Sequence, residues 1–328
     1  MIAVTGANGL LGSFVIRKLL DHHETVVGIC RKNSDLSLLH DVAGQITWRH
    51  ADIMDPVSLE EALKGAEEVI HAAATVSINP RKAEQIMRIN VVGTRNVVNA
   101  CLELDVRRLI HVSSVAALGS QKNQTRIDET NKWIDTPFNS VYAQSKYFAE
   151  LEVFRAQEEG LSTAIVNPSF ILAEANWNIS SAQFFKYAWE EHAFYINGFM
   201  NYVDVLDVAE VIYRLLRNEV EGRRFIVSAG NIRYHDLLGK ITREFGKKAP
   251  SVRVPNAVLG PFAFIESIRS GITQTEPKIT KDTAKLASTQ FLFANDSVTK
   301  HLNFKFQPID ETLKRCCRYY MARLNAKK

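Results

Sequence analysis

A glycine-spaced turn close to the first residue constrains the fold more than any other feature of this chain. The turn, Thr5-Gly-Ala-Asn-Gly-Leu-Leu-Gly12, follows a short apolar run at Met1–Thr5 and precedes a helical pattern at Ser13–Asp21. An apolar run of this length is typical of a buried parallel strand. The order strand, glycine turn, helix is the context in which such a turn binds a dinucleotide.

Each of the three glycines has a physical reason to be glycine. Gly6 can adopt the tight turn, Gly9 lets a pyrophosphate approach the backbone, and Gly12 lets the helix pack closely on the strand. The helix N-terminus then faces the negative charge of the phosphates. The residues expected to contact the cofactor here are Thr5, Gly6, Asn8, Gly9, Leu10, Leu11 and Gly12.

Strands and helices alternate through the first half of the chain, and this alternation predicts an α/β fold with a doubly wound parallel sheet, the Rossmann arrangement. The expected strands are Met1–Thr5, Thr25–Ile29, one starting at Ile46–Trp48, Glu68–Ala73, Arg108–Ser113 and Ser162–Asn167. The expected helices are Ser13–Asp21, Pro56–Lys64, Ala83–Leu104 and Ser140–Gln157.

After Pro168 the alternation weakens, with a strand expected at Arg224–Ser228 and a helix at Tyr234–Phe245. The segment Lys247–Thr280 carries several prolines and has no clean period. We interpret the C-terminal part as a smaller substrate-binding lobe interleaved with the sheet. The expected division is 1–170 with 200–230 for the cofactor domain, and 171–199 with 231–328 for the lobe.

Composition excludes several classes of function. The 328 residues carry a net charge of +4 without a basic stripe, so nucleic acid is not an expected partner. No apolar run approaches the roughly 20 residues needed to cross a membrane. The four cysteines lack CxxC spacing and a histidine cluster, so no metal site is expected. Together with the absence of a signal peptide, these features predict a cytoplasmic protein.

The end of the second strand indicates which nicotinamide cofactor is bound. An acid at this position would hold the ribose hydroxyls and repel a 2′-phosphate. This chain instead has Cys30-Arg31-Lys32, with no acid until Asp35. Arg31 can pair with a 2′-phosphate or stack on adenine, and Lys32 can add a positive charge. NADP(H) is therefore preferred and NAD(H) remains possible; the alternative is a solvated basic turn.

Two further strand ends are expected to contact the cofactor. Asp52 can accept a hydrogen bond from the adenine amino group, with Ile53 as an apolar wall, while Asp55 is expected to cap the next helix. The small residues Ala72, Ala73 and Ala74 leave room for the cofactor. His71, just before them, is expected to be a packed histidine and not a ligand.

The chemistry is expected at Tyr142-Ala-Gln-Ser-Lys146. The i to i+4 spacing places Tyr142 and Lys146 on one face of a helix. A phenol with a pKa near 10 is a poor acid or base at neutral pH, but a neighbouring ammonium and a positively charged nicotinamide favour the phenolate. Ser114, at the end of the fifth strand, can donate a hydrogen bond to a substrate carbonyl.

The chain resembles the extended short-chain dehydrogenase/reductase superfamily, also called the NAD-dependent epimerase/dehydratase family. The resemblance covers nearly the whole sequence and is closest in character to dihydroflavonol-reductase-like members. It rests on TGANGLLG (Thr5–Gly12), HAAA (His71–Ala74), NVVGTRNVVNAC (Asn90–Cys101), HVSSVAALG (His111–Gly119), YAQSKYFAE (Tyr142–Glu150), NPS (Asn167–Ser169), NYVDVLDVAEVI (Asn201–Ile212) and LNFKFQP (Leu302–Pro308).

The resemblance implies a role for each matching position. Tyr142 would be the acid–base residue, Lys146 would hold the nicotinamide ribose, and Ser114 would be the catalytic hydroxyl. A homodimer through the Ala83–Leu104 and Ser140–Gln157 helices is also implied. The further residues implied at the cofactor are Asn90, Ser113, Pro168 and Ser169.

The leading hypothesis is an NADP(H)-dependent reductase of an aldehyde or ketone on a small molecule. Sugar dehydratases of the family carry acids just after the catalytic hydroxyl, where this chain has Val115 and Ala116. The alternatives are an NAD-dependent nucleotide-sugar epimerase, a 3β-hydroxysteroid-type dehydrogenase and, from another class, a non-catalytic NADP sensor. Aromatic residues between Phe184 and Tyr195 are expected in the core of the lobe, the other interpretation being a substrate pocket.

Overall fold

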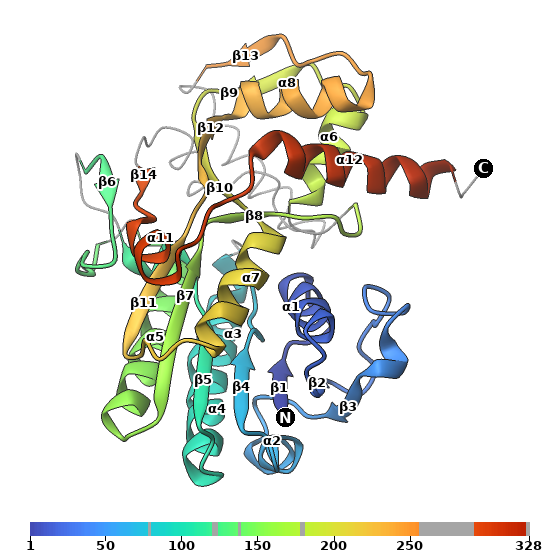
Figure 1. Cartoon of the computed structure of the whole chain (residues 1–328). Helices are drawn as coiled ribbons and strands as arrows, with labels where there is room; N and C mark the ends of the chain where they lie inside the picture. Colours follow the sequence, from blue (N-terminus) through green and yellow to red (C-terminus); the bar gives the residue numbers. More distant parts are fainter. Residues whose placement is uncertain (78–79, 120–123, 137–138, 178–180, 256–291, 326–328) are drawn as a thin grey trace.

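The computed structural model describes residues 1–77, 80–119, 124–136, 139–177, 181–255 and 292–325. Its centre is a seven-stranded sheet in the order β3-β2-β1-β4-β5-β7-β11, in which every neighbouring pair is parallel (Figure 1). The strands of this sheet are β1 (Ile2–Thr5), β2 (Val26–Cys30), β3 (Thr47–His50), β4 (Glu68–His71), β5 (Arg108–Val112), β7 (Ser162–Pro168) and β11 (Arg223–Val227). The predicted doubly wound parallel sheet is confirmed.

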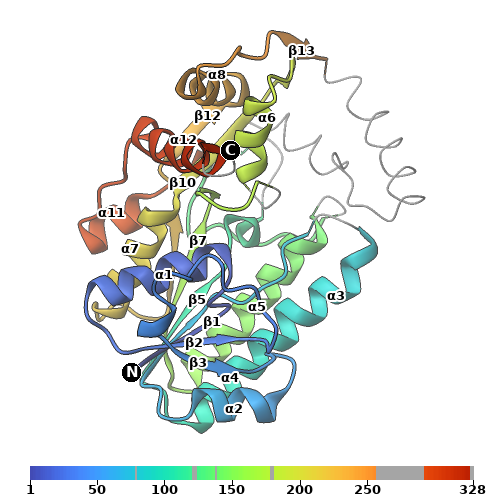
Figure 2. The same ribbon diagram turned by 90° about the vertical axis from the view of Figure 1, so that its right-hand side faces the viewer.

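Helices cover both faces of the sheet, which gives three layers (Figure 2). One face packs against α1 (Leu10–Asp21), α7 (Val205–Leu216) and α11 (Asp296–Leu302). The other packs against α2 (Pro56–Leu63), α4 (Gly93–Glu103) and α5 (Val141–Glu158). Because both faces are covered, the inner strands are buried along their whole length, which explains their continuous apolar runs.

Two predicted helices differ from the structure in instructive ways. Helix α1 begins at Leu10, three residues before the predicted start, because Gly9 already serves as its N-cap. The predicted long helix Ala83–Leu104 is continuous, but it contains a π-helical turn, η3 (Arg88–Val92), between α3 (Ala83–Met87) and α4. An inserted turn of this kind is frequent at functional sites and leaves no clear mark on apolar spacing.

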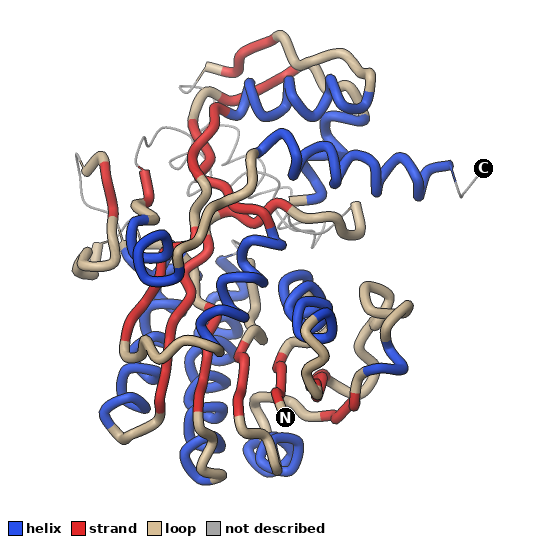
Figure 3. Tube along the Cα trace, in the orientation of Figure 1, coloured by secondary structure: helices blue, strands red, loops and turns tan. Residues whose placement is uncertain are grey.

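The second half of the chain builds a lobe above the carboxyl ends of the sheet strands (Figure 3). Its core combines aliphatic and aromatic side chains: Phe185 and Tyr320 are fully buried, and Trp177 packs against Tyr320 with ring centroids 4.3 Å apart. The expectation that the aromatic stretch forms core therefore holds for Phe185, whereas Phe194 is 56% exposed.

Sequence reasoning found helix α8 (Tyr234–Phe245) but missed most other elements of this lobe. Its proline-rich segment Lys247–Thr280 lies outside the described residues from 256 onward. The elements after Pro168 without a prediction from sequence are helices α7 and α11 and also β8 (Phe170–Leu172), α6 (Ala182–Trp189), β9 (Phe194–Ile196), β10 (Phe199–Asp204), β12 (Gly230–Arg233), β13 (Val252–Val254) and α12 (Ile309–Asn325). The remaining short elements, most of them in the first half of the chain, are η1 (Ala43–Gln45), η2 (Pro80–Lys82), η4 (Val115–Leu118), β6 (Arg126–Ile127) and β14 (Leu292–Phe293).

Candidate active site

The glycine turn has the geometry that a pyrophosphate needs. Gly6 has φ +66°, and a Cβ on it would lie 2.7 Å from the Ala73 Cα. A Cβ on Gly12 would lie 2.2 Å from the Gly6 carbonyl oxygen, so only glycine allows this approach of helix and strand. Gly9 caps α1 without any side-chain hydrogen bond, which leaves backbone N–H groups at the helix N-terminus available to an anion.

Several residues of this turn also make structural contacts. The Asn8 side chain donates to the Asp35 carbonyl at 3.4 Å and so links the turn to the loop after β2. The Thr5 hydroxyl is buried and lies 2.7 Å from Nδ1 of His71, which is a structural use that the sequence did not predict. Leu10 and Leu11 are half-buried and pack against the lobe core and the sheet core respectively.

His71 is a packed histidine, as expected. Its Nε2 lies 3.0 Å from the Thr94 hydroxyl, which itself donates to the Asn90 carbonyl at 2.6 Å. Thr94 therefore accepts from Nε2–H, and Nδ1 accepts from Thr5. Burial lowers the pKa of His71 to about 3, with the charge of Lys146 adding to the effect. The neutral imidazole of His71 thus links β4 to β1 through Thr5 and to α4 through Thr94.

The basic turn after β2 is open to a ligand. Arg31 and Lys32 are both exposed, and neither forms an ion pair within the described part of the chain. The Arg31 carbonyl accepts from two following N–H groups and closes the turn. The carboxylate of Asp35 accepts from the Ser37 N–H and hydroxyl and forms no ion pair with either cation among the described residues.

The next strand end holds Asp52 and Ile53 in different ways. Asp52 is exposed and its carboxylate accepts from the backbone of Met54 at 2.9 Å. Ile53 is half-buried, and a Cβ on Gly93 would lie 2.6 Å from its Cδ1, so this side chain packs directly on α4. Asp55 caps α2 by accepting from Val57, as predicted.

Ser114, Tyr142 and Lys146 come together at the carboxyl edge of the sheet. Ser114 follows β5 and caps the short helix η4, accepting from the Ala116 N–H at 3.2 Å. Tyr142 lies in the first turn of α5, close enough to Ser114 for its hydroxyl to lower the pKa of the phenol. Lys146, one turn later and 2% exposed, donates from Nζ to the Val112 carbonyl at 2.8 Å.

Burial dominates the electrostatics of these side chains. It raises the pKa of Tyr142, and the Ser114 hydroxyl only partly opposes this. The expectation that a neighbouring ammonium and the positive charge of the nicotinamide together favour the phenolate stays a prediction; in the chain itself Lys146 bonds to a backbone carbonyl. Burial lowers the pKa of Lys146 to about 8, against the opposing charge of Glu150. An amine that titrates just above neutral pH is suited to proton chemistry.

Asn90 supports the site through the π-helical turn. It is 1% exposed; its Oδ1 accepts from the Thr75 N–H at 2.8 Å and its Nδ2 donates to the Thr75 carbonyl at 3.0 Å. Nδ2 also donates to the hydroxyl of Ser145 at 2.9 Å, and Ser145 in turn bonds to the Tyr142 carbonyl. Asn90 thus ties the loop after β4 to the first turn of α5.

Three more predicted positions lie near the ends of β5 and β7. The Ser113 hydroxyl donates to Glu150 at 2.5 Å, so this side chain is committed to the protein interior. Pro168 ends β7 and is buried. Ser169 is 7% exposed, and its hydroxyl has no hydrogen-bond partner in the described ranges, so it remains available to a ligand.

Sequence reasoning missed a second set of residues behind the site. Glu150, Asn167 and Arg224 form a buried network beneath Ser113 and Ser114. The i+4 spacing of Glu150 from Lys146 was a signal that could have drawn attention to it. Asn167 and Arg224 carry no such signal, because their proximity to α5 depends on the order of strands in the sheet.

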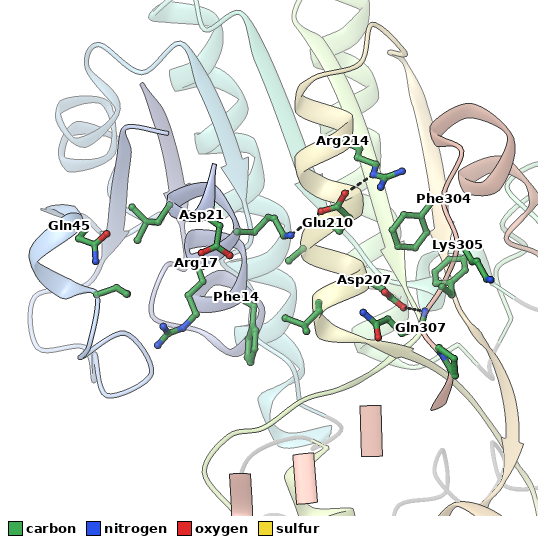
Figure 4. Close-up of a pocket in the computed structure, with 17 residues that line it drawn as sticks. Phe14, Arg17, Asp21, Gln45, Asp207, Glu210, Arg214, Phe304, Lys305 and Gln307 are labelled. Atoms are coloured by element: carbon green, nitrogen blue, oxygen red, sulfur yellow. Dashed lines mark hydrogen bonds and ion pairs between the residues drawn. The ribbon is translucent and has the colours of Figure 1, made fainter. Parts of the chain in front are cut away.

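A separate groove of about 790 Å³ lies between α1, α7 and the segment 304–308, and none of the predicted site residues lines it (Figure 4). Two of its acidic side chains are already bonded: Glu210 pairs with Lys18 and Arg214, and Asp207 accepts from the Gln307 N–H. Within the described ranges, no group of three or more metal-ligating side chains is found. No described helix is long and apolar enough to cross a membrane.

Comparison with known proteins places this geometry in a family. Residues 2–228 match the NAD dependent epimerase/dehydratase family. Cinnamoyl-CoA reductase 1 of Petunia hybrida is 31% identical over 261 residues, which cover 75% of this chain and 77% of the relative. A dihydroflavonol 4-reductase-like protein of Synechocystis sp. is 27% identical over 94% of this chain and 91% of its own.

Solved structures agree with the sequence relatives. The crystal structure of gox2253 is similar with a TM-score of 0.85 and 29% identity, and it covers 98% of both chains. The enzyme WbmH of Bordetella bronchiseptica, solved in complex with NAD+, shares the fold with a TM-score of 0.77 at 20% identity and 98% coverage of both chains. The chain belongs to the NAD dependent epimerase/dehydratase family, within the extended short-chain dehydrogenase/reductase superfamily, and is an NAD(P)-dependent oxidoreductase.

Proposed function

We propose that this protein is an NADP(H)-dependent reductase that converts an aldehyde or ketone of a small molecule into an alcohol. The observation that carries the proposal is the position of Tyr142 in the first turn of α5, beside Ser114 and one helical turn from the buried Lys146. This arrangement lies at the carboxyl edge of the sheet, on the same side as the glycine turn.

The chain's own groups would handle the proton and the orientation of the substrate. The Ser114 and Tyr142 hydroxyls donate hydrogen bonds to the carbonyl oxygen, and Tyr142 transfers its proton to that oxygen as the alcohol forms. The Lys146 ammonium stabilises the phenolate left behind. When bound at the glycine turn, a nicotinamide cofactor would supply the hydride. Neutral phenol is the starting form for this step, and burial keeps Tyr142 in that form at neutral pH.

The residues after Ser114 support carbonyl reduction over dehydration. Val115 and Ala116 are half-buried beside the catalytic hydroxyl and carry no acid that could protonate a substrate hydroxyl so that it leaves as water. The sequence relatives that are named as reductases support the same assignment. We infer dihydroflavonol-reductase-like chemistry, with the lobe at 171–199 and 231–328 supplying the substrate contacts.

NADP(H) is proposed as the preferred cofactor because of the turn after β2. Arg31 and Lys32 are exposed and unpaired within the described residues, next to the loop that Asn8 links to the glycine turn. A 2′-phosphate would meet two positive charges there, whereas Asp35 is held by Ser37.

A homodimer and a cytoplasmic location complete the proposal. Helix α5 presents Phe148 and Leu151, each about two-fifths exposed, on its outer surface. Such side chains favour a helical interface between two copies of the chain. The charged variant Leu151→Glu is expected to separate a dimer in size-exclusion chromatography with light scattering.

The proposed cytoplasmic location rests on the cysteines. All four are free thiols, which favours a reducing compartment.

The test is a screen for NADPH oxidation over aldehydes, ketones, flavonoid-like and steroid-like carbonyls. We expect turnover of at least one carbonyl class with formation of the alcohol. Nucleotide sugars incubated with NAD+ serve as the comparison, since an epimerase would interconvert them without net oxidation of a cofactor. Epimerisation of a nucleotide sugar, together with no reduction of any carbonyl, would refute the proposal.

A further inference from the structure

Glu150 is a buried carboxylate that lies directly behind the reacting side chains. It follows Lys146 by one turn of α5 and Tyr142 by two turns, so all three share one face of the helix. Its side chain is 1% exposed. A buried carboxylate costs several kcal/mol unless its oxygens are bonded and its charge is compensated. The bonds that hold Glu150 therefore indicate what it does.

Each oxygen of Glu150 has a defined partner. Oε1 accepts from the Ser113 hydroxyl at 2.5 Å and from Nδ2 of Asn167 at 2.5 Å. Oε2 faces Nη1 of Arg224 at 3.3 Å. These partners come from β7, β11 and the residue after β5, so one carboxylate joins the edges of three strands to α5.

These bonds fix the short segment that carries the catalytic hydroxyl. Lys146 holds the Val112 carbonyl at 2.8 Å, and Glu150 holds the Ser113 hydroxyl. The same Asn167 amide that bonds to Glu150 also donates to the Ser114 carbonyl at 2.9 Å. Three consecutive residues are thus held in place, the last of them being Ser114.

Burial raises the pKa of Glu150, and the bond from Ser113 and the charge of Arg224 oppose that rise; the ionised carboxylate supplies negative charge next to Lys146. Its carboxylate favours the protonated amine, opposing the burial that lowers the pKa of Lys146. The other titratable groups facing Lys146 are His71 on β4 and His111 on β5, both buried; burial first, and then the charge of Lys146, lower their pKa values. They are neutral at working pH and add no charge. The charge that faces Glu150 from β11 is Arg224.

We propose that Glu150 is a positioning residue of the active site: it holds the strand end that bears Ser114 against α5 and keeps the Lys146 amine protonated at neutral pH. This inference rests on the proposed function, because it assigns Glu150 to the same acid–base set. Glu150 acts through Ser113, Asn167 and Lys146 and does not contact the reacting atoms.

The competing explanation is a purely structural ion pair between Glu150 and Arg224. A matched control exists at the opposite end of the sheet. Glu68, the first residue of β4, is also buried and is paired with Arg107 and Arg217. The Glu68→Gln variant removes a buried, arginine-paired carboxylate without touching the site. A structural role predicts similar behaviour for Glu150→Gln and Glu68→Gln.

The first measurement is the pH dependence of kcat for reduction. Glu150→Gln keeps the shape and can still accept from Ser113 and Asn167, but it removes the charge. We expect its alkaline limb to move to lower pH by about one unit, with kcat about 5-fold lower at pH 8. The NADPH Kd at pH 7 should stay within about 2-fold of the parent value. Glu68→Gln should lower Tm and leave the profile unchanged.

The second measurement does not depend on turnover. In protein labelled with ¹³C-lysine, the Cε resonance of Lys146, identified by its loss in Lys146→Arg, should titrate near pH 8. In Glu150→Gln the midpoint should fall, and in Glu68→Gln it should not move. Glu150→Asp keeps the charge on a shorter side chain, so it should retain the midpoint while lowering kcat through the misplaced Ser114.

An unchanged Lys146 midpoint in Glu150→Gln, with an unchanged pH profile, would overturn the inference. If Glu150→Gln fails to fold, Glu150→Asp decides: full kcat in that variant counts against positioning. The proposed function fails separately, when Tyr142→Phe retains full turnover or no carbonyl is reduced. In that case the lysine titration still decides whether Glu150 sets the state of Lys146.

Discussion

The two ends of the central sheet use charged residues in contrasting ways. At the amino end, Glu68 is paired with Arg107 and Arg217, and Arg217 also reaches Glu24. The arginines of these pairs are at least one-third exposed, and the pairs connect neighbouring elements. Such partly exposed ion pairs add modest stability and need no further chemistry to explain them.

At the carboxyl end, Lys146 and Glu150 are buried, and Tyr142 is half-buried beside Ser114. Lys146 bonds to a backbone carbonyl and Glu150 to the Ser113 hydroxyl. Their pKa values are shifted mainly by burial. The comparison shows that charge alone does not identify the site of chemistry. A better indicator of the candidate site is a group of desolvated titratable side chains at the end of the sheet where the strand ends and the N-terminus of α1 converge.

The largest effect is expected from Tyr142→Phe at the carboxyl end. Loss of the proton donor should lower kcat by about 10³-fold, while the Kd for NADPH and the Tm stay near the parent values. Steady-state kinetics and fluorescence titration measure these quantities. Tyr213→Phe on α7, where the ring stacks on His22, is the control and should keep full activity. Comparable activity in both variants would contradict the catalytic role.

The next largest effect is expected from Gly12→Ala in the turn. The new Cβ would lie 2.2 Å from the Gly6 carbonyl oxygen, so the turn must move and lose its fit to the pyrophosphate. NADPH affinity should fall by about 100-fold, with a stability loss of about 1–3 kcal/mol. Gly44→Ala is the matched control, because its Cβ would meet no atom within 4 Å. Binding that survives Gly12→Ala would place the cofactor elsewhere.

A smaller and selective effect is expected from Arg31→Ala. Loss of the charge at the 2′-phosphate should weaken NADPH binding by about 10-fold and NADH binding by less than 2-fold. The exposed Arg318→Ala on α12 controls for net charge. Equal losses for the two cofactors would reject the proposed preference for NADP(H) and leave Arg31 as part of a solvated turn.

The smallest effect on activity is expected at the amino end. Arg217→Ala removes the bonds to Glu24 and Glu68, and Glu68 keeps its contact with Arg107. We expect the free energy of unfolding to fall by about 1 kcal/mol with kcat and cofactor Kd unchanged. Denaturant titration and kinetics test this. A change in kcat would show that the two ends are coupled.

Much of the carboxyl end could be predicted from sequence because local spacing determines it. The glycine turn requires glycine for steric reasons, and Tyr142 and Lys146 share a helix face through their spacing. Ser114 follows a strand whose end is marked by the change from apolar to small polar residues. The cap of α2 by Asp55 was predicted on the same local basis.

The features that could not be predicted from sequence depend on contacts between distant parts of the chain. Arg224 and Asn167 reach Glu150 only because β11 and β7 are neighbours in the sheet. The sequence of the lobe has no clear apolar periodicity, because its short strands are covered by aromatic side chains from several helices. The structural uses of Thr5 and Ser113 likewise depend on partners 66 and 37 residues away.

The most direct test of the central claim is isotope transfer from NADPH carrying deuterium at the transferable C4 position. The account predicts that wild-type enzyme places one deuterium on the former carbonyl carbon of an accepted substrate. It also predicts that Tyr142→Phe, with cofactor bound, transfers almost none in the same time. Oxidation of NADPH without label in the product, or equal transfer by the Tyr142→Phe variant, would contradict the assignment of Ser114, Tyr142 and Lys146 as the reducing site.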